Sequence, residues 1–121
     1  MDKSKRKELL EEFKQIKTYA GVVQITNTTN GKIFIDSYPN LKNKWSTIQA
    51  QLEMGMFANL ALQKDWKLLG KDAFVYEVLE QKDIELMHDM RWEVKVMVKP
   101  WLEKLQPYGD RGYNRLPREP K

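Results

Sequence analysis

Residues 21–37 read GVVQITNTTNGKIFIDS, which is two short apolar runs on either side of an Asn30-Gly31 pair. Both runs are rich in β-branched residues, and apolar and polar residues alternate within them, as in half-buried strands. Asn-Gly accepts positive φ at both central positions of a tight turn. The segment therefore predicts a two-stranded antiparallel hairpin that turns at Asn30-Gly31, and the fold has to be built around it.

Helices are predicted on both sides of this hairpin. Apolar residues recur at helical spacing over residues 4–17, which predicts an amphipathic helix before the first strand. After the second strand, the same spacing predicts a helix that has Asn40 as its N-cap and stops at Gly55.

The second half of the chain alternates between helix and strand. A further helix is predicted to end at Gly70, and residues 73–80, AFVYEVLE, are predicted to form a third strand. The longest helix is expected over residues 83–105, with Trp92 off its apolar stripe and therefore exposed. Pro100 lacks the N–H that a helix needs, so a kink or a short break is expected there. The fold class predicted is α+β, a three-stranded antiparallel sheet flanked by helices.

The composition limits the chemistry that this chain can perform. Its 121 residues suit one domain, here placed at 20–114 between an N-terminal helix (1–19) and an irregular basic tail (115–121). The chain has no Cys and only one His, His88, which excludes thiolate metal sites and makes Ser-His-Asp catalysis unsupported. No run approaches ~18 apolar residues and no signal peptide is recognisable, so a cytoplasmic protein without a membrane partner is expected.

The charge gives weaker information about partners. The formal net charge is +4 and the pI is near 9.2. Such a balance would favour an anionic partner such as nucleic acid, but 21 cationic and 17 acidic side chains mostly describe a mixed, well-solvated surface.

Two triplets and their surroundings resemble the GIY-YIG endonuclease family. The triplets are Gly21-Val22-Val23 and Phe34-Ile35-Asp36, and the supporting segments are NTTNGKIFI, NLKNKW, GKDAF and GYN in the same order as in the family. The resemblance spans residues 20–114. It implies a GIY-YIG nuclease-like fold and a relationship to enzymes that hydrolyse phosphodiesters in DNA.

The resemblance also implies a set of site positions, and most of them are substituted here. In the family, two Tyr hydroxyls lie by the water and phosphate, an Arg contacts the phosphate, and a Glu on the long helix holds one divalent ion. The family-equivalent positions in this chain are Val23, Phe34, Lys44, Ile48, Val98 and Asn114. No catalytic residue is therefore assigned, and Asn114 is the polar family position that is retained.

The loss of a metal ligand at Val98 is the most consequential substitution, because Mg²⁺ requires oxygen ligands. Glu93 and Glu103 lie five residues away, about 140° around the helix, so neither is expected to project along the same face. Asp36 remains as a weak metal candidate, with the capping of a strand end as the competing interpretation. No cofactor is expected unless the protein is active, in which case it would be Mg²⁺ or Mn²⁺.

Three interpretations of function stay open at this point. The first is a degenerate, catalytically inactive nuclease-like domain that binds DNA or RNA as an accessory or regulatory module. The second is an active, divergent, metal-dependent endonuclease, and the third is a protein-interaction or structural module with a protein partner or a second copy of itself. The candidate nucleic-acid-binding residues are Lys42, Lys44, Arg111 and Arg115.

Overall fold

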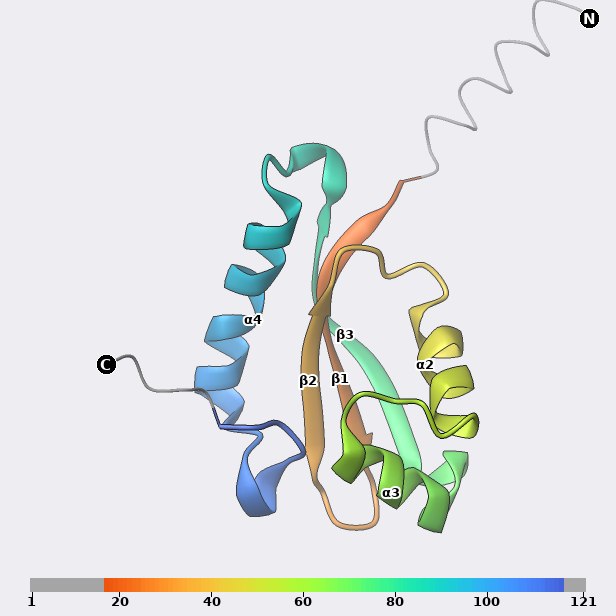
Figure 1. The fold of residues 1–121 in the computed structure, drawn as a ribbon. Helices are drawn as coiled ribbons and strands as arrows, with labels where there is room; N and C mark the ends of the chain where they lie inside the picture. Colours follow the sequence, from red (N-terminus) through yellow and green to blue (C-terminus); the bar gives the residue numbers. More distant parts are fainter. Residues whose placement is uncertain (1–16, 117–121) are drawn as a thin grey trace, which may run out of the picture.

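A computed structural model describes residues 17–116, and within them a three-stranded sheet is flanked by three α-helices (Figure 1). The helix predicted before the hairpin lies outside the described residues, except for Lys17. No helix within residues 17–116 is long and apolar enough to cross a membrane. In chain order the strands and α-helices are β1 (Tyr19–Asn27), β2 (Ile33–Tyr38), α2 (Lys44–Glu53), α3 (Leu60–Leu69), β3 (Phe74–Asp83) and α4 (Met90–Leu105).

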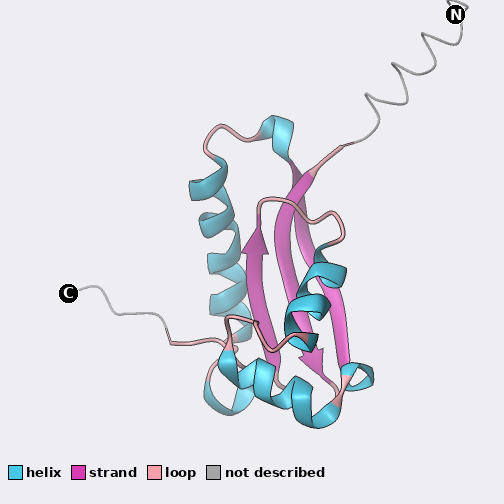
Figure 2. Cartoon of the chain, turned by 45° about the vertical axis from the view of Figure 1, so that its right-hand side comes forward, coloured by secondary structure: helices cyan, strands magenta, loops and turns pink. Residues whose placement is uncertain are grey.

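The sheet is antiparallel throughout, with the strand order β2-β1-β3. α4 lies on one face of the sheet, and α2 and α3 lie on the other (Figure 2). Because β1 is central and covered on both faces, Ala20, Val22, Val23 and Ile25 are all fully buried. β2 is left as an edge strand, and this edge becomes the centre of the candidate site.

The main core lies between the sheet and the α2–α3 pair. Trp66 is buried and Trp45 packs against it edge to face, with ring centroids 6.0 Å apart. Trp45 also stacks on Tyr76 of β3 at 5.1 Å. These aromatic contacts fix α2 and α3 on the sheet.

The hairpin is confirmed, but its turn is longer than predicted. The Asn27 N–H donates to the Lys32 carbonyl, and the Gly31 N–H donates to the Asn27 carbonyl, each at 2.8 Å. Residues 28–32 thus connect the strands, and of the Asn-Gly pair only Gly31, with φ 78°, has positive φ. The prediction of positive φ at both positions was wrong, because Asn30 instead accepts a hydrogen bond from the Lys32 N–H with its side chain.

Two predicted helix starts also need correction. α2 begins at Lys44 behind Asn43, which has φ 55°, whereas Asn40 accepts the Lys42 N–H in a turn before the helix. α4 begins at Met90 with Asp89 as its cap, and residues 84–86 form a separate 3₁₀ turn. Both errors have the same cause, because Asn and Asp side chains stabilise turns as readily as helix ends.

Pro100 lies inside α4 and the helix continues through it to Leu105, so the break predicted near Lys99 is absent. Pro100 is exposed, and the carbonyl that loses its partner can therefore be solvated. Trp92 is 62% exposed, as its place off the apolar stripe predicted.

Candidate functional site

Asp36, near the end of edge strand β2, lies at the junction of three cavities. The largest, of about 640 Å³, lies between β2 and α4. A second, of about 380 Å³, opens toward the loop between α2 and α3, and a third, of about 490 Å³, lies toward the start of α4. We call these cavities together the Asp36 groove.

The Asp36 carboxyl is held by its immediate neighbours. It accepts a hydrogen bond from the Ser37 N–H at 2.8 Å, and the Tyr38 hydroxyl and the Lys44 ammonium also stabilise its charge. Partial burial outweighs these contacts and raises the pKa of Asp36 above its ordinary value. Lys44 lies over the Tyr38 ring at 4.3 Å, so these three side chains form one cluster.

We expect Asp36→Asn to stabilise the protein at neutral pH. A raised folded-state pKa means that ionised Asp36 opposes folding, and this cost disappears as the pH falls through that pKa. Above pH 7, the melting temperature of the variant should exceed that of the wild type by a few °C at most. Such a shift corresponds to a gain of about 1 kcal/mol or less in the free energy of unfolding.

The control for this prediction is the pH dependence itself. Thermal unfolding followed by circular dichroism should show the two proteins converging as the pH approaches 3.8, the ordinary pKa of the group. A variant that is less stable than the wild type at pH 7, by an amount that does not vary with pH, would contradict the proposed burial cost.

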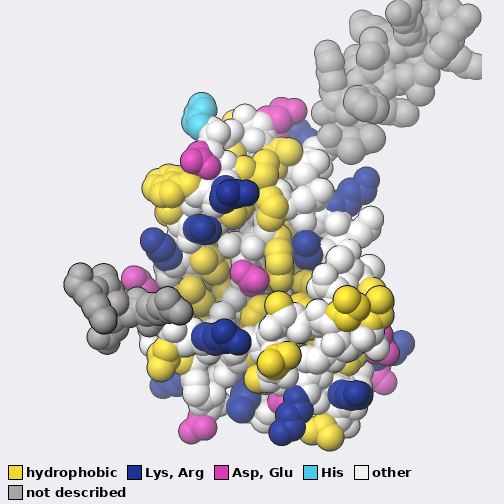
Figure 3. Space-filling model, in the orientation of Figure 1, with side chains coloured by type: hydrophobic (Ala, Val, Ile, Leu, Met, Phe, Trp, Pro, Cys, Tyr) yellow, Lys and Arg dark blue, Asp and Glu magenta, His cyan; other side chains and the backbone are white. Residues whose placement is uncertain are grey.

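Cationic side chains border the groove on both sides. Lys95 and Lys99 of α4 line the largest cavity, Arg91 lines the third, and Arg115 lines the second. Figure 3 shows dark blue Lys and Arg side chains along α4 and around the middle of this face. Four cations thus line the groove, and a fifth, Lys44, lies over the Tyr38 ring, where its charge acts on Asp36.

The structure groups the predicted nucleic-acid-binding residues only in part. Arg115 lines the second cavity, and Lys44 lies beside the groove, over the Tyr38 ring. Lys42 and Arg111 are exposed and line none of the three cavities. Sequence reasoning did not select Arg91, Lys95 and Lys99, although their spacing on one helix was a usable signal.

The family-equivalent positions converge on the same place. Val23 pairs with Asp36 across the β1–β2 ladder and is fully buried. Phe34, two residues before Asp36, lines the second cavity and packs on Phe57 with centroids 5.6 Å apart. Ile48 belongs to the core. None of the side chains at Val23, Phe34 and Ile48 offers a polar atom to the groove.

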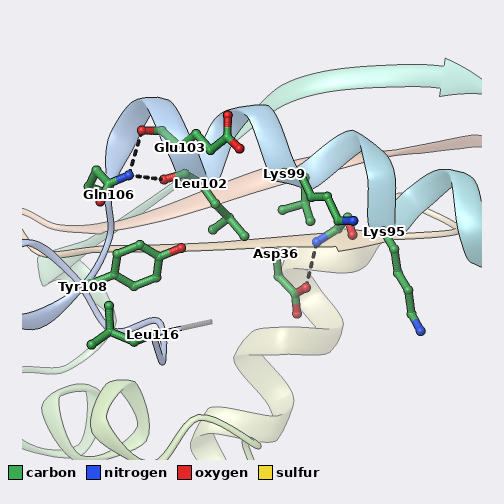
Figure 4. A pocket seen from close by; sticks show the side chains of 10 residues that line it. Asp36, Lys95, Lys99, Leu102, Glu103, Gln106, Tyr108 and Leu116 are labelled. Carbon is green, nitrogen blue, oxygen red and sulfur yellow. Dashed lines mark hydrogen bonds between the residues drawn. The ribbon is translucent and has the colours of Figure 1, made fainter. Parts of the chain in front are cut away.

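The donor set does not fit the divalent ion that the family implies. Val98 lines the largest cavity and supplies no oxygen. Five α4 residues line that cavity, and Glu103 is one of them, as are Val98 and Leu102. In Figure 4, however, the Leu102 side chain lies between Glu103 and Asp36.

Glu93, near the start of α4, is held by other groups and does not line the groove. Glu93 pairs with Lys82 at 3.0 Å, and it accepts the N–H groups of His88 and Asp89 at 2.8 and 3.1 Å. These interactions lower the pKa of Glu93, the bond to Lys82 most strongly. Among residues 17–116 no three His, Cys, Asp or Glu side chains converge to hold a metal ion.

Asn114 closes the outer edge of β2. Its side-chain oxygen accepts the Ile35 N–H at 2.9 Å, and its amide donates to the Ile35 carbonyl at 2.7 Å. The Tyr113 N–H donates to the Ile33 carbonyl at 2.9 Å. The retained polar residue thus satisfies backbone groups of an edge strand, a role that its position in the sequence does not reveal.

Tyr113 anchors this closing segment to the rest of the domain. Its hydroxyl donates to Asp65 of α3 at 2.7 Å and accepts the Asn27 amide at 2.9 Å. Its carbonyl accepts from the Asn59 side chain at 2.8 Å. Burial, together with the charge of Asp65, raises the pKa of Tyr113 to about 12.

Tyr113→Phe is expected to destabilise the domain by about 1–3 kcal/mol, because the fully buried Asn27 amide loses its partner. Urea unfolding measures this change. Tyr108→Phe is a suitable control, because the Tyr108 hydroxyl makes no hydrogen bond within residues 17–116, and it should change stability by less than about 0.5 kcal/mol. Equal stability of the two variants would contradict the anchoring role.

The fold and the position of the groove define the class of this protein. A three-stranded antiparallel sheet with a hairpin start, two helices on one face and a long helix on the other matches the fold of the GIY-YIG endonuclease catalytic domain. This match of fold confirms the resemblance drawn from the triplets and their surrounding segments.

Two solved structures carry the comparison. A point mutant of the catalytic domain of the intron endonuclease I-TevI matches with a TM-score of 0.65 and 25% identity, over 79% of this chain and 92% of the other. A structure of the catalytic domain of the homing endonuclease I-TevI matches with a TM-score of 0.65 and 24% identity, over 81% and 99%. No protein-family model matches the sequence, and neither does a curated protein.

Proposed function

We propose that this chain is a GIY-YIG nuclease-like domain that binds DNA or RNA without cutting it, as an accessory or regulatory module. The observation that carries the proposal is the set of four cations that line the Asp36 groove, with Lys44 beside it, on the same part of the fold where the family-equivalent positions meet. Such a cationic track attracts phosphates regardless of sequence and releases their counterions. The two structural neighbours are endonuclease domains, which supports a nucleic-acid ligand.

The proposal of inactivity rests on the chemistry of the side chains at those positions. Hydrolysis of a phosphodiester needs a base for water and compensation of the charge that gathers on the phosphoryl oxygens. Val23, Phe34 and Val98 can neither exchange a proton nor bind a metal ion. Lys44 retains the positive charge of the family Arg, but as a point charge it holds a phosphate less specifically than a guanidinium does.

One observation favours the alternative of a divergent, metal-dependent endonuclease. Asp36 is a carboxylate at the junction of all three cavities. An ion or a reacting phosphate bound in any one of them would therefore lie next to Asp36. Mg²⁺ is bound in many enzymes by one or two carboxylates together with waters and phosphates. Under this alternative, Asp36→Ala would abolish cleavage.

The decisive experiment is fluorescence anisotropy with labelled duplex, single-stranded and branched DNA and with RNA, at several salt and Mg²⁺ concentrations. The probes are examined afterwards for cuts. We expect the logarithm of the affinity to fall linearly with the logarithm of the salt concentration, and the probes to remain intact. Cuts that require Mg²⁺ and are lost in Asp36→Ala would establish the alternative enzyme, whereas no binding at low salt would leave a protein-interaction module.

A further inference from the structure

The largest part of the Asp36 groove has the character of a pocket for a flat, mainly apolar group. Its volume of about 640 Å³ is within the range of small-molecule sites. Figure 4 shows Leu102 pointing from α4 into the space between Tyr108 and Asp36, with Leu116 below Tyr108. Apolar side chains and a half-buried tyrosine ring are suitable neighbours for a nucleobase, because every base has a π-face that can stack.

The charges at this cavity are arranged in two zones. Lys95 and Lys99 are exposed and lie on α4, where they can meet phosphates. Glu103 lies further along the same helix, and Figure 4 shows its carboxylate on the far side of Leu102 from Asp36. Asp36 is the acid on the β2 side, and it would repel a phosphate placed against it. A complementary ligand is therefore negative along α4 and presents N–H donors at β2. A nucleotide whose base enters the cavity meets both requirements.

The acceptor capacity of Asp36 restricts the choice of base. A carboxylate has about four lone-pair sites and can accept two parallel bonds. Within the described residues, Asp36 accepts a bond from the Ser37 N–H and lies by the Tyr38 hydroxyl, which leaves sites free. Guanine presents two adjacent donors, N1–H and the N2 amino group, on its Watson–Crick edge. Cytosine and adenine present one amino group beside an acceptor, and thymine presents one N–H between two carbonyls.

We propose that the cavity between β2 and α4 binds single-stranded nucleic acid by taking in one guanine base, whose Watson–Crick edge donates to Asp36 while Lys95 and Lys99 meet the flanking phosphates. This inference rests on the proposed function and deepens it. A duplex does not satisfy it, because its Watson–Crick edges are already paired.

The test uses labelled oligothymidine probes that carry one central substitution, measured by anisotropy at a single salt concentration. The probe with one dG should bind at least about fivefold more tightly than the probes with dA, dC or dT there. Deoxyinosine, which lacks the N2 amino group, should lose most of this preference. 7-Deazaguanine, which keeps the Watson–Crick edge, should retain it. Oligouridine with one G distinguishes RNA from DNA as the source of the base.

Asp36→Asn provides the matching test on the protein. An amide has one acceptor oxygen where the carboxylate has two, and it offers donors of its own, so the variant should bind the dG and dT probes within about twofold of each other. Salt-dependent binding with no preference for dG over deoxyinosine would overturn this inference and leave the proposed function standing. No binding of any probe would overturn both. Because the inosine comparison uses the wild-type protein, the result does not depend on the stability of the variant.

Discussion

Gly112→Ala is expected to destabilise the domain by about 3 kcal/mol and to lower its melting temperature by roughly 10 °C. A Cβ at this position would lie 2.4 Å from the Ile33 carbonyl oxygen and 2.5 Å from that of Pro107. Both neighbours are backbone atoms, so no side-chain rotation relieves the contact. The backbone of Gly112 is extended, which any residue tolerates, so the expected cost comes from close approach alone.

The consequence for the site should exceed the loss of stability. Gly112 pairs with Ile33 along the edge of β2, and the residues that follow bring Asn114 to Ile35 and Arg115 to the groove. A segment that is pushed off the edge cannot hold these side chains in place. Amide hydrogen exchange should therefore show the Ile35 N–H losing protection in the folded variant.

Gly55→Ala is the matched control for this variant. Unlike Gly112, Gly55 has positive φ, 72°, but nothing lies within 4 Å of an added Cβ, so the cost should stay near 1 kcal/mol and β2 should remain protected. Thermal unfolding and exchange of both variants measure the difference. A Gly112→Ala protein as stable as Gly55→Ala would show that the segment is not held against β2 as described.

The elements of this fold were predictable because each is stabilised locally. The strand patterns, the glycine stops at Gly55 and Gly70 and the apolar stripe of α3 all depend on residues close in sequence. The errors arose at Asn30, Asn40 and the start of α4, where a polar side chain can stabilise more than one kind of turn or helix end. Which of these structures forms depends on where the next element packs, and the local sequence pattern carries no information about that packing.

The candidate site was predictable only in outline. The resemblance identified Val23, Phe34 and Val98, and the structure gathers these positions around Asp36. The sequence did not predict the contacts between segments far apart in the chain, such as Tyr113 with Asn27 and Asn114 with Ile35. Asn114 illustrates the reason, because the same amide can serve a ligand or an unpaired strand edge, and only the packing of the last residues decides between them.

Removing both lysines that line the α4 side of the groove is expected to weaken binding of single-stranded DNA by about tenfold or more. Lys95→Ala/Lys99→Ala leaves the fold intact, because both side chains are exposed and neither makes a hydrogen bond or ion pair within residues 17–116. If each lysine meets one phosphate, the slope of log affinity against log salt should fall by ~1.4 for a single strand. Anisotropy titrations at four or more salt concentrations measure both quantities.

Lys67→Ala/Lys71→Ala supplies a control with the same change in net charge. Lys67 lies on α3 and Lys71 lies before β3, at the opposite edge of the sheet from β2, and neither lines the Asp36 groove. A general electrostatic attraction would respond equally to the two double variants, because it depends only on total charge. A groove that holds phosphates responds to the first variant alone. Equal losses of affinity and equal salt slopes would therefore contradict a binding track along α4, even if the protein binds nucleic acid.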